Sequence, residues 1–320
     1  MQEEIFIGVD VAKDEVVYAI DGQSQVGCVA NDASSLTAWL GQFALGTRIA
    51  MESTGRYHLL LANLAHQAGL RVYVLNPVDV KHFRQSNGIR AKTDRVDAQV
   101  IAQMLAERHA RAGWRPWCSG TEAQQEIDAL LRRRATLAVH RSAIEQAMKD
   151  MPAVAPQLQQ ALTALSELAK AVDRQVQQRV QADERMAECY QRLREIDGVG
   201  KQTAAALVNL FTRVPFGNAD ALVAYVGFDP RPNDSGTRTG RRRITKRGPS
   251  ELRRLLFLVA QAAGRSRALK PVYQTIRAKG FSTTQALVIL ARKLLRIAFS
   301  IWKTGQSYDA RRLLPSTQNA

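Results

Sequence analysis

The stretch IFIGVDVAKDEVVYAIDGQSQVGCVA, residues 5–30, decides the fold of the first third of the chain. It holds three short runs of apolar and β-branched residues with polar breaks between them, at Ile5–Val9, Val16–Ile20 and Val26–Ala30. Such runs predict strands, and strands that follow one another this closely usually pair with their neighbours. The stretch therefore predicts an antiparallel meander of three strands.

Helix and strand patterns alternate after the meander. The pattern predicts, in order, a helix at Leu36–Phe43, a strand at Arg48–Met51, a helix from about Tyr57 to Ala68, a strand at Val72–Leu75, and helical segments at Val78–Phe83 and Asp94–Glu107. Three meander strands followed by this series are typical of a ribonuclease-H-like (RuvC-like) α/β fold. We predict this fold for residues 1–118.

The middle of the chain, residues 119–195, is predicted to be helical. It contains no glycine from residue 121 onward and is rich in alanine, leucine, glutamine, glutamate and arginine. Two prolines interrupt the pattern, so we expect two long helices, at about 121–150 and 157–195, that form a coiled-coil hairpin. A spacer or a dimerisation arm is the simplest role for such a hairpin.

The last part of the chain, residues 196–320, is predicted to be a basic, mainly α-helical domain. Its first residues, IDGVGKQTA at 196–204, resemble a helix-hairpin-helix turn. A final helix is expected to begin after the cap residue Ser282 and to end near Gly305. Between its helices, a polar, arginine-rich loop is expected from Asp229 to Gly248.

The net charge of +16 is concentrated at one end of the chain. Residues 197–320 contain 22 lysines and arginines against 6 acidic residues, whereas residues 1–196 contain 23 of each sign. This asymmetry favours a polyanion-binding module joined to a neutral one over basicity that serves solubility alone. Nucleic acid is the expected partner.

The cysteines and the N-terminus indicate a reducing, cytoplasmic setting. Cys28, Cys118 and Cys189 are odd in number and far apart, which argues against a disulfide framework and a cysteine-based zinc site. The acidic N-terminus does not resemble a signal peptide. No apolar run approaches the roughly 18 residues that a membrane helix needs, so no membrane partner is expected.

Four acidic residues of the first domain are candidate metal ligands. Asp10 ends the first predicted strand and Glu52 ends the fourth, and the carboxyl ends of strands in an open sheet line a crevice where ligands bind. Asp94 and Asp97 lie three positions apart at the start of a helix, so they share one face. Carboxylate oxygens suit Mg²⁺, and paired ions stabilise both oxygens that change bonds in phosphoryl transfer.

Each of these acids also has a simpler interpretation. Asp10 suits a turn at a strand end, Glu52 suits a solvated loop, and acids such as Asp94 and Asp97 stabilise the dipole of a helix at its first turn. However, all four occur where a ribonuclease-H-like fold places its metal ligands. Gathered carboxylates repel one another, and a bound cation resolves that repulsion.

The arginine-rich loop contains a candidate nucleophile, Ser235. A serine there could attack a phosphodiester while arginines stabilise the developing charge. From the residues alone, a serine favoured by turn chemistry is the preferred interpretation. Arginine side chains bind phosphate through two parallel hydrogen bonds; the candidate phosphate-binding residues of this loop are Arg238, Arg241, Arg242, Arg243, Lys246 and Arg247.

The glycine turn at the start of the last domain is a second candidate phosphate site. Backbone N–H groups around Gly198 and Gly200, followed by Lys201, could bind a DNA phosphate without reading the base sequence. The alternative is a simple glycine turn between two helices.

These motifs together resemble those of the DEDD insertion-sequence transposases, relatives of the pilin-gene invertase, along nearly the full length of the chain. That family joins a RuvC-like domain to a transposase domain through a coiled coil. The resemblance is carried by Gly8–Lys13 (GVDVAK), Glu52–Gly55 (ESTG), Lys92–Ala98 (KTDRVDA), Ile196–Gly200 (IDGVG), Tyr225–Pro230 (YVGFDP) and Ser235–Gly236.

The resemblance implies an RNA-guided DNA transposase or recombinase. It implies that Asp10, Glu52, Asp94 and Asp97 bind Mg²⁺, and that Ser235 becomes covalently joined to cleaved DNA. It also implies a structured non-coding bridge RNA that pairs with donor and target DNA. Family members act as dimers that pair into tetramers, with an active site built from the carboxylates of one protomer and the serine of another.

Two other functions compete with this one. The first is a RuvC-like junction-resolving nuclease in which water is the nucleophile and Ser235 is structural. The second is a non-catalytic protein that binds RNA or DNA on a decayed ribonuclease-H scaffold. The presence of all four carboxylates argues against the second, because a decayed site is expected to lose at least one of them.

Overall fold

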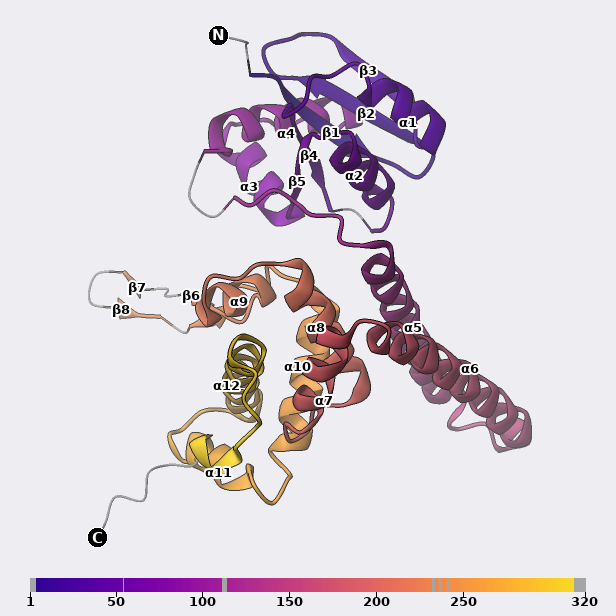
Figure 1. Ribbon diagram of the computed structural model, residues 1–320, viewed down its shortest axis with the longest axis vertical. Helices are drawn as coiled ribbons and strands as arrows, with labels where there is room; N and C mark the ends of the chain where they lie inside the picture. Colours follow the sequence, from indigo (N-terminus) through magenta and orange to yellow (C-terminus); the bar gives the residue numbers. More distant parts are fainter. Residues whose placement is uncertain are drawn as a thin grey trace. The chain divides into compact units, whose positions relative to one another are not determined.

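A computed structural model describes residues 4–53, 55–110, 114–231, 234–235, 238–240 and 242–313 of the protein. The chain divides into two compact units, Met1–Ser119 and Gly120–Ala320 (Figure 1). The first unit contains a mixed α/β sheet, and the second is mainly helical.

The first unit is built on a five-stranded sheet. Its strands are β1 (Phe6–Val11), β2 (Glu15–Ile20), β3 (Val26–Ala30), β4 (Arg48–Glu52) and β5 (Arg71–Leu75), arranged in the order β3-β2-β1-β4-β5. The first three pair antiparallel, which confirms the predicted meander. The strands β4 and β5 add to β1 in parallel. The predicted α/β class is thus confirmed for this unit. Its sheet, with both antiparallel and parallel pairs, is consistent with a ribonuclease-H-like domain.

Helices cover both faces of this sheet (Figure 1). They are α1 (Ala33–Leu40) and α2 (His58–Gln67) on one face, and α3 (Pro77–Ser86) and α4 (Asp94–Arg108) on the other. Two separate apolar clusters result. Ile7 and Val9 of β1 pack with Leu36 and Leu61 of the first helix pair, whereas Ala50 of β4 belongs to the cluster that α3 and α4 cover. Successive residues of a strand therefore point to opposite helix layers.

Helix α4 lies directly on strand β1 at Gly8. A Cβ atom at Gly8 would be 2.1 Å from the backbone nitrogen of Ala102 and 2.2 Å from the carbonyl oxygen of Ala98. Nearer the start of the strand, the ring of Phe6 lies against His109, with 4.7 Å between the ring centroids. Helix α4 thus runs antiparallel to β1. Its first turn therefore lies toward the end of β1 that carries Asp10.

The second unit begins with two 27-residue helices that pack along each other, α5 (Glu122–Met148) and α6 (Ala155–Gln181), and a short helix η1 (Pro152–Val154) joins them. The prediction of one helix over 157–195 was wrong. Helix α6 ends at Gln181, and a new helix α7 (Glu184–Arg194) follows. Asp183 has extended backbone angles, and its carboxylate accepts a hydrogen bond of 2.8 Å from the backbone nitrogen of Met186. This cap starts a helix inside a glycine-free segment.

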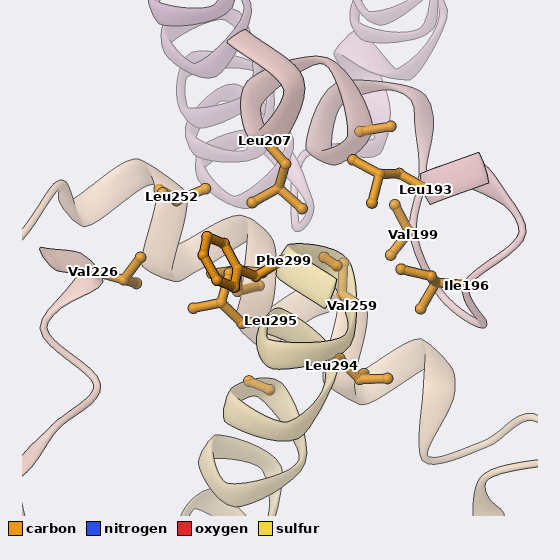
Figure 2. Packing of buried hydrophobic residues seen from close by; sticks show 14 of the residues in the cluster. Leu193, Ile196, Val199, Leu207, Val226, Leu252, Val259, Leu294, Leu295 and Phe299 are labelled. Carbon is orange, nitrogen blue, oxygen red and sulfur yellow. The ribbon is translucent and has the colours of Figure 1, made fainter. Parts of the chain in front are cut away.

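Five further helices pack around one apolar core (Figure 2). They are α8 (Lys201–Arg213), α9 (Ala219–Val226), α10 (Ser250–Ala263), α11 (Lys270–Ala278) and α12 (Thr283–Thr304), followed by the short helix η2 (Ala310–Leu313). Leu295 and Phe299 of α12 are buried in the same cluster as Leu207 of α8. The predicted caps of α12 are confirmed, with a capping box at Ser282 and a left-handed Gly305. None of the helices described is long and apolar enough to span a membrane.

The segment from Asp229 to Gly248, which we call the serine ribbon, was predicted to be a loop. It contains β-structure, so that prediction was wrong. Antiparallel pairs join β6 (Pro230–Arg231) to β9 (Arg243–Ile244) and β7 (Asp234–Ser235) to β8 (Arg238–Thr239). Each strand has only two residues, which is too short for an alternating apolar pattern to be visible in the sequence.

We expect Gly8→Ala to lower the free energy of unfolding by about 1–3 kcal/mol or more, because the added methyl group overlaps backbone atoms of α4 that cannot rotate away. Chemical denaturation of the full chain measures this. Gly41→Ala is the matched control in the same unit, because its added Cβ meets nothing closer than 3.5 Å. Equal stability of the Gly8→Ala and Gly41→Ala variants would contradict the close approach.

Candidate active site

Asp10 and Glu52 lie on neighbouring parallel strands and face the same helix layer. In the register of β1 and β4, Gly8 pairs with Ala50 and Val9 pairs with Met51, so the next position places Asp10 beside Glu52. Gly8 and Ala50 both face α4, and alternate residues share a face. The pleat and register of the sheet therefore direct both carboxylates toward α4.

Helix α4 supplies the other two carboxylates from its first turn. Asp94 is its first residue, and the side chain of Thr93 caps the helix by accepting a hydrogen bond from the backbone nitrogen of Val96. Asp94 is exposed, whereas Asp97 is half-buried. Because α4 runs opposite to β1, this turn lies at the Asp10 end of the strand.

The electrostatics of Asp10 couple it to the other three acids. Burial, and then the negative charges of Asp94, Asp97 and Glu52 in that order, together raise the pKa of Asp10 to about 6. These side chains repel one another when all are ionised. The structure therefore places the other three acidic residues that the sequence singles out within electrostatic reach of Asp10.

The four carboxylates suit a divalent cation by donor type and by charge. Oxygen donors are the ligands that Mg²⁺ prefers, and an ion among them would offset the repulsion that raises the pKa of Asp10. Within the described residues, however, no three histidine, cysteine, aspartate or glutamate side chains are grouped closely enough to hold a metal ion. Side-chain rotation would have to bring the carboxylates onto a shared ion.

Arg84 is a neighbour of this site that the sequence did not indicate. Its Nη1 atom lies 3.0 Å from Oδ1 of Asp97, and each side chain is only 18% exposed. Arg84 belongs to α3, and the pair forms because α3 packs on α4. No motif surrounds Arg84, so only this packing reveals it. Its guanidinium group partly compensates the charge of Asp97.

The candidate nucleophile belongs to the second unit. Ser235 is exposed on β7, where it pairs with Arg238 of β8. The side chain of Arg238 and the whole of Arg241 lie outside the described residues. Ser235 is thus exposed to solvent, on a strand pair of the serine ribbon.

The other basic candidates of this segment are exposed. Arg242, Arg243, Lys246 and Arg247 all present their side chains to solvent. Lys246 adopts a left-handed backbone with a φ of 56°, which is unusual for a residue other than glycine. Exposed cations are suited to contact phosphates of a nucleic-acid backbone.

The glycine turn joins α7 to α8, as expected for Gly198 and Gly200. Gly198 has a φ of +83°, and a Cβ atom there would lie 2.5 Å from the carbonyl oxygen of Val259, so α10 packs tightly against the turn. Gly200 forms the N-cap of α8, and Lys201 is the exposed first residue of that helix. The start of α8 is therefore open to solvent beside a lysine, which suits an anion.

Two family models match the chain. Residues 7–152 match the model of the DEDD transposases of IS110, whose description is "Transposase". Residues 190–274 match a model with the description "Transposase IS116/IS110/IS902 family". The first match includes all four carboxylates, and the second includes the glycine turn and Ser235.

Curated proteins resemble the chain over nearly its whole length or over about half of it. The pilin gene-inverting protein of Moraxella bovis is 26% identical over 322 residues, which cover 96% of this chain and 98% of that protein. The transposase for insertion sequence element IS1111A of Coxiella burnetii is 24% identical over 96% of this chain and 92% of its own length. An insertion element IS110 protein of Streptomyces coelicolor is 32% identical over 160 residues, which cover 49% of this chain and 38% of that protein.

We expect Asp10→Asn to stabilise the metal-free protein at about pH 8. A carboxyl whose pKa rises from about 3.9 unfolded to about 6 folded lowers the stability as the pH increases through that interval. Removing its charge should raise the free energy of unfolding by about 1–2 kcal/mol. This is roughly half of the value that the full pKa shift gives, because the group is partly exposed to solvent.

Thermal or urea denaturation in a chelating buffer measures this effect. The gain should shrink as the pH falls below about 6 and disappear at about pH 3, where Asp10 is largely protonated in both states. Asp14→Asn is the control, because Asp14 is an exposed acid just beyond the same strand. The charge coupling is contradicted if Asp10→Asn gives no gain at pH 8, or a gain that does not depend on pH.

Proposed function

Because the chain belongs to the IS110 family of transposases, and is therefore a DNA-processing enzyme, we propose that it cuts and rejoins DNA in a reaction that requires Mg²⁺ and passes through a covalent serine–DNA intermediate. The observation that carries the proposal is that three carboxylates, those of Asp94, Asp97 and Glu52, act on Asp10 and help to raise its pKa. Membership of the family confirms the resemblance predicted from the sequence motifs.

The carboxylates provide the metal-dependent half of the chemistry. Asp10, Glu52, Asp94 and Asp97 are the residues that would hold Mg²⁺. The metal would stabilise negative charge on the phosphate that reacts. The support for this role is the raised pKa of Asp10, because a group of acids in one place is costly for a protein that does not bind a cation there.

Ser235 provides the nucleophile in this proposal. Its hydroxyl oxygen would form a bond to phosphorus while the bond from phosphorus to a sugar oxygen breaks. The serine releases its proton, and the departing sugar oxygen takes up a proton to become a free hydroxyl. The number of phosphate ester bonds is unchanged, so a later attack by another sugar hydroxyl can release the serine and join two DNA strands.

The basic residues of the second unit bind the nucleic acids. We propose that the arginines and lysines around Ser235, with Lys201 at the start of α8, contact backbone phosphates of donor and target DNA. A helix-hairpin-helix role for the Gly198–Gly200 turn belongs to this proposal. The family resemblance further suggests a structured guide RNA encoded beside the gene.

The assembly and domain roles are also proposals. Residues 1–118 would form a ribonuclease-H-like catalytic domain, residues 119–195 a coiled-coil spacer or dimerisation arm, and residues 196–320 the basic transposase domain. The carboxylates and Ser235 belong to different units, so the reaction requires both units to act on one phosphodiester. We propose dimers that pair into tetramers, in which one protomer supplies the carboxylates and another supplies the serine.

A junction-resolving nuclease with water as the nucleophile is the second candidate. The observation that favours it is that all four carboxylates belong to the first unit, which does not contain Ser235. In that case Ser235 would only shape the ribbon. The two candidates differ in whether DNA becomes attached to the protein.

The wild-type protein should form a protein–DNA adduct that survives detergent denaturation. The assay contains Mg²⁺, a supercoiled plasmid with the DNA that flanks the gene, and RNA transcribed from the same flanking DNA. Ser235→Ala should reduce adduct formation by at least about 10³-fold, because it removes the attacking oxygen. Ser250→Ala, which changes an exposed serine of the same unit, should leave the yield unchanged.

Asp10→Asn or an excess of chelator should also abolish the adduct. Strand cleavage by Ser235→Ala at the wild-type rate would contradict the serine mechanism and favour the nuclease with a water nucleophile. Full activity of Asp10→Asn, or of the wild type in chelator, would contradict the metal-dependent half.

A further inference from the structure

The serine ribbon joins the helical part of the second unit through a narrow neck. The neck brings together the end of α9 and residues 245–248, which follow β9. At Gly248, a Cβ atom would lie 1.8 Å from the carbonyl oxygen of Tyr225. At Gly227, a Cβ atom would lie 2.7 Å from the backbone nitrogen of Arg247. The two chain segments are thus in direct backbone contact, which only glycine at both positions allows.

Hydrogen bonds close this neck. The backbone nitrogen of Lys246 donates to the carbonyl oxygen of Gly227 at 3.0 Å, and that of Thr245 donates to the carbonyl oxygen of Asp229 at 3.0 Å. The hydroxyl group of Thr245 also donates to the carboxylate of Asp229. These bonds help to offset the cost of the left-handed backbone at Lys246. The ends of the ribbon are therefore fixed to each other.

One side chain binds both sides of the neck. Arg253 lies in the first turn of α10, and its Nη1 atom donates to the carbonyl oxygen of Val226, which precedes the ribbon, at 3.1 Å. The same atom donates to the carbonyl oxygen of Gly248, which follows the ribbon. Burial lowers the pKa of Arg253, as expected for a guanidinium group withdrawn from water. Charge-assisted bonds to two carbonyl groups compensate part of that desolvation.

We propose that Arg253 is a positioning residue for the serine-dependent reaction: it ties the entry and exit of the serine ribbon to α10 and so holds Ser235 in one orientation on the second unit. This inference rests on the proposed function of Ser235. It assigns to Arg253 a role through the ribbon, without contact with the reacting phosphate.

The neighbouring residues separate this role from a general contribution to folding. Leu252 and Leu256 of α10 are buried in the apolar core, whereas Arg253 is only half-buried and its guanidinium group binds main-chain carbonyl groups. Arg254 carries the same charge one position later, but its guanidinium group pairs with Glu251 within its own helix. A change at Arg254 therefore alters the charge of α10 and leaves the neck intact.

The test compares Arg253→Gln, Arg253→Lys and the matched control Arg254→Gln in the full chain. Hydrogen exchange of the backbone amides at 245–246 reports on the neck whether or not the protein is active. In Arg253→Gln this exchange should become at least about tenfold faster, while exchange in the core of α12 stays at the wild-type rate. Arg253→Lys, which keeps one charged donor, should show a smaller increase, and Arg254→Gln should show none.

Single-turnover kinetics provide the second readout. At saturating plasmid DNA and guide RNA, Arg253→Gln should form the adduct at least about tenfold more slowly. Its dissociation constant for a labelled duplex from one end of the flanking DNA should stay within about threefold of the wild-type value. Arg253→Lys should recover part of the rate. A residue that only stabilises the fold would not slow adduct formation while leaving the dissociation constant for DNA unchanged.

Several results would overturn the proposal. Unchanged amide exchange in Arg253→Gln would show that Arg253 does not hold the neck. Faster exchange with adduct formation at the wild-type rate would show that the neck does not position Ser235. An equal loss of rate in Arg254→Gln would show that charge on α10 is responsible. Absence of an adduct from the wild-type protein would instead contradict the serine mechanism itself, and the exchange result would then stand only as a description of the neck.

Discussion

The contact of helix α4 with strand β1 at Gly8 is the constraint on which the first unit depends. The helix backbone lies so near the strand that no side chain fits between them. This contact fixes the position of α4 along β1, and thereby brings the first turn of the helix to the end of the strand that carries Asp10. The sheet register adds Glu52 from β4. The elements that carry the four acids are held near one another by a backbone contact and by the sheet register, rather than by attraction between side chains.

The first unit is neutral overall but holds acids at one place, whereas the second unit carries the whole net positive charge. In the first unit, the neighbouring acids raise the pKa of Asp10, and the guanidinium group of Arg84 forms an ion pair with Asp97. In the second, the excess of basic residues includes exposed cations in the serine ribbon. A divalent ion would relieve the repulsion between acids in the first unit. The phosphates of a nucleic-acid backbone would relieve the repulsion between cations in the second. These two ligands are the ones that the proposed metal-dependent reaction on DNA needs.

Local patterns in the sequence predicted the parts of the fold that depend on near neighbours. The meander followed from alternating apolar runs, and both ends of α12 followed from Ser282 and Gly305. The break between α6 and α7 was missed because Asp183 does not differ visibly from other polar residues of a helical segment. The serine ribbon was missed because its strands are so short. Arg84 and Arg253 were missed because their partners come from tertiary packing, which no motif spacing records.

Binding of Mn²⁺ to the full-length, metal-free protein tests the central claim most directly, because it asks whether the four gathered carboxylates share a cation. The signal of free Mn²⁺ in electron paramagnetic resonance gives the binding isotherm without any need for activity or DNA. The account predicts saturable binding by the wild type and by Asp14→Asn, and at least about tenfold weaker binding by Asp10→Asn. Identical isotherms for the wild type and Asp10→Asn would contradict it.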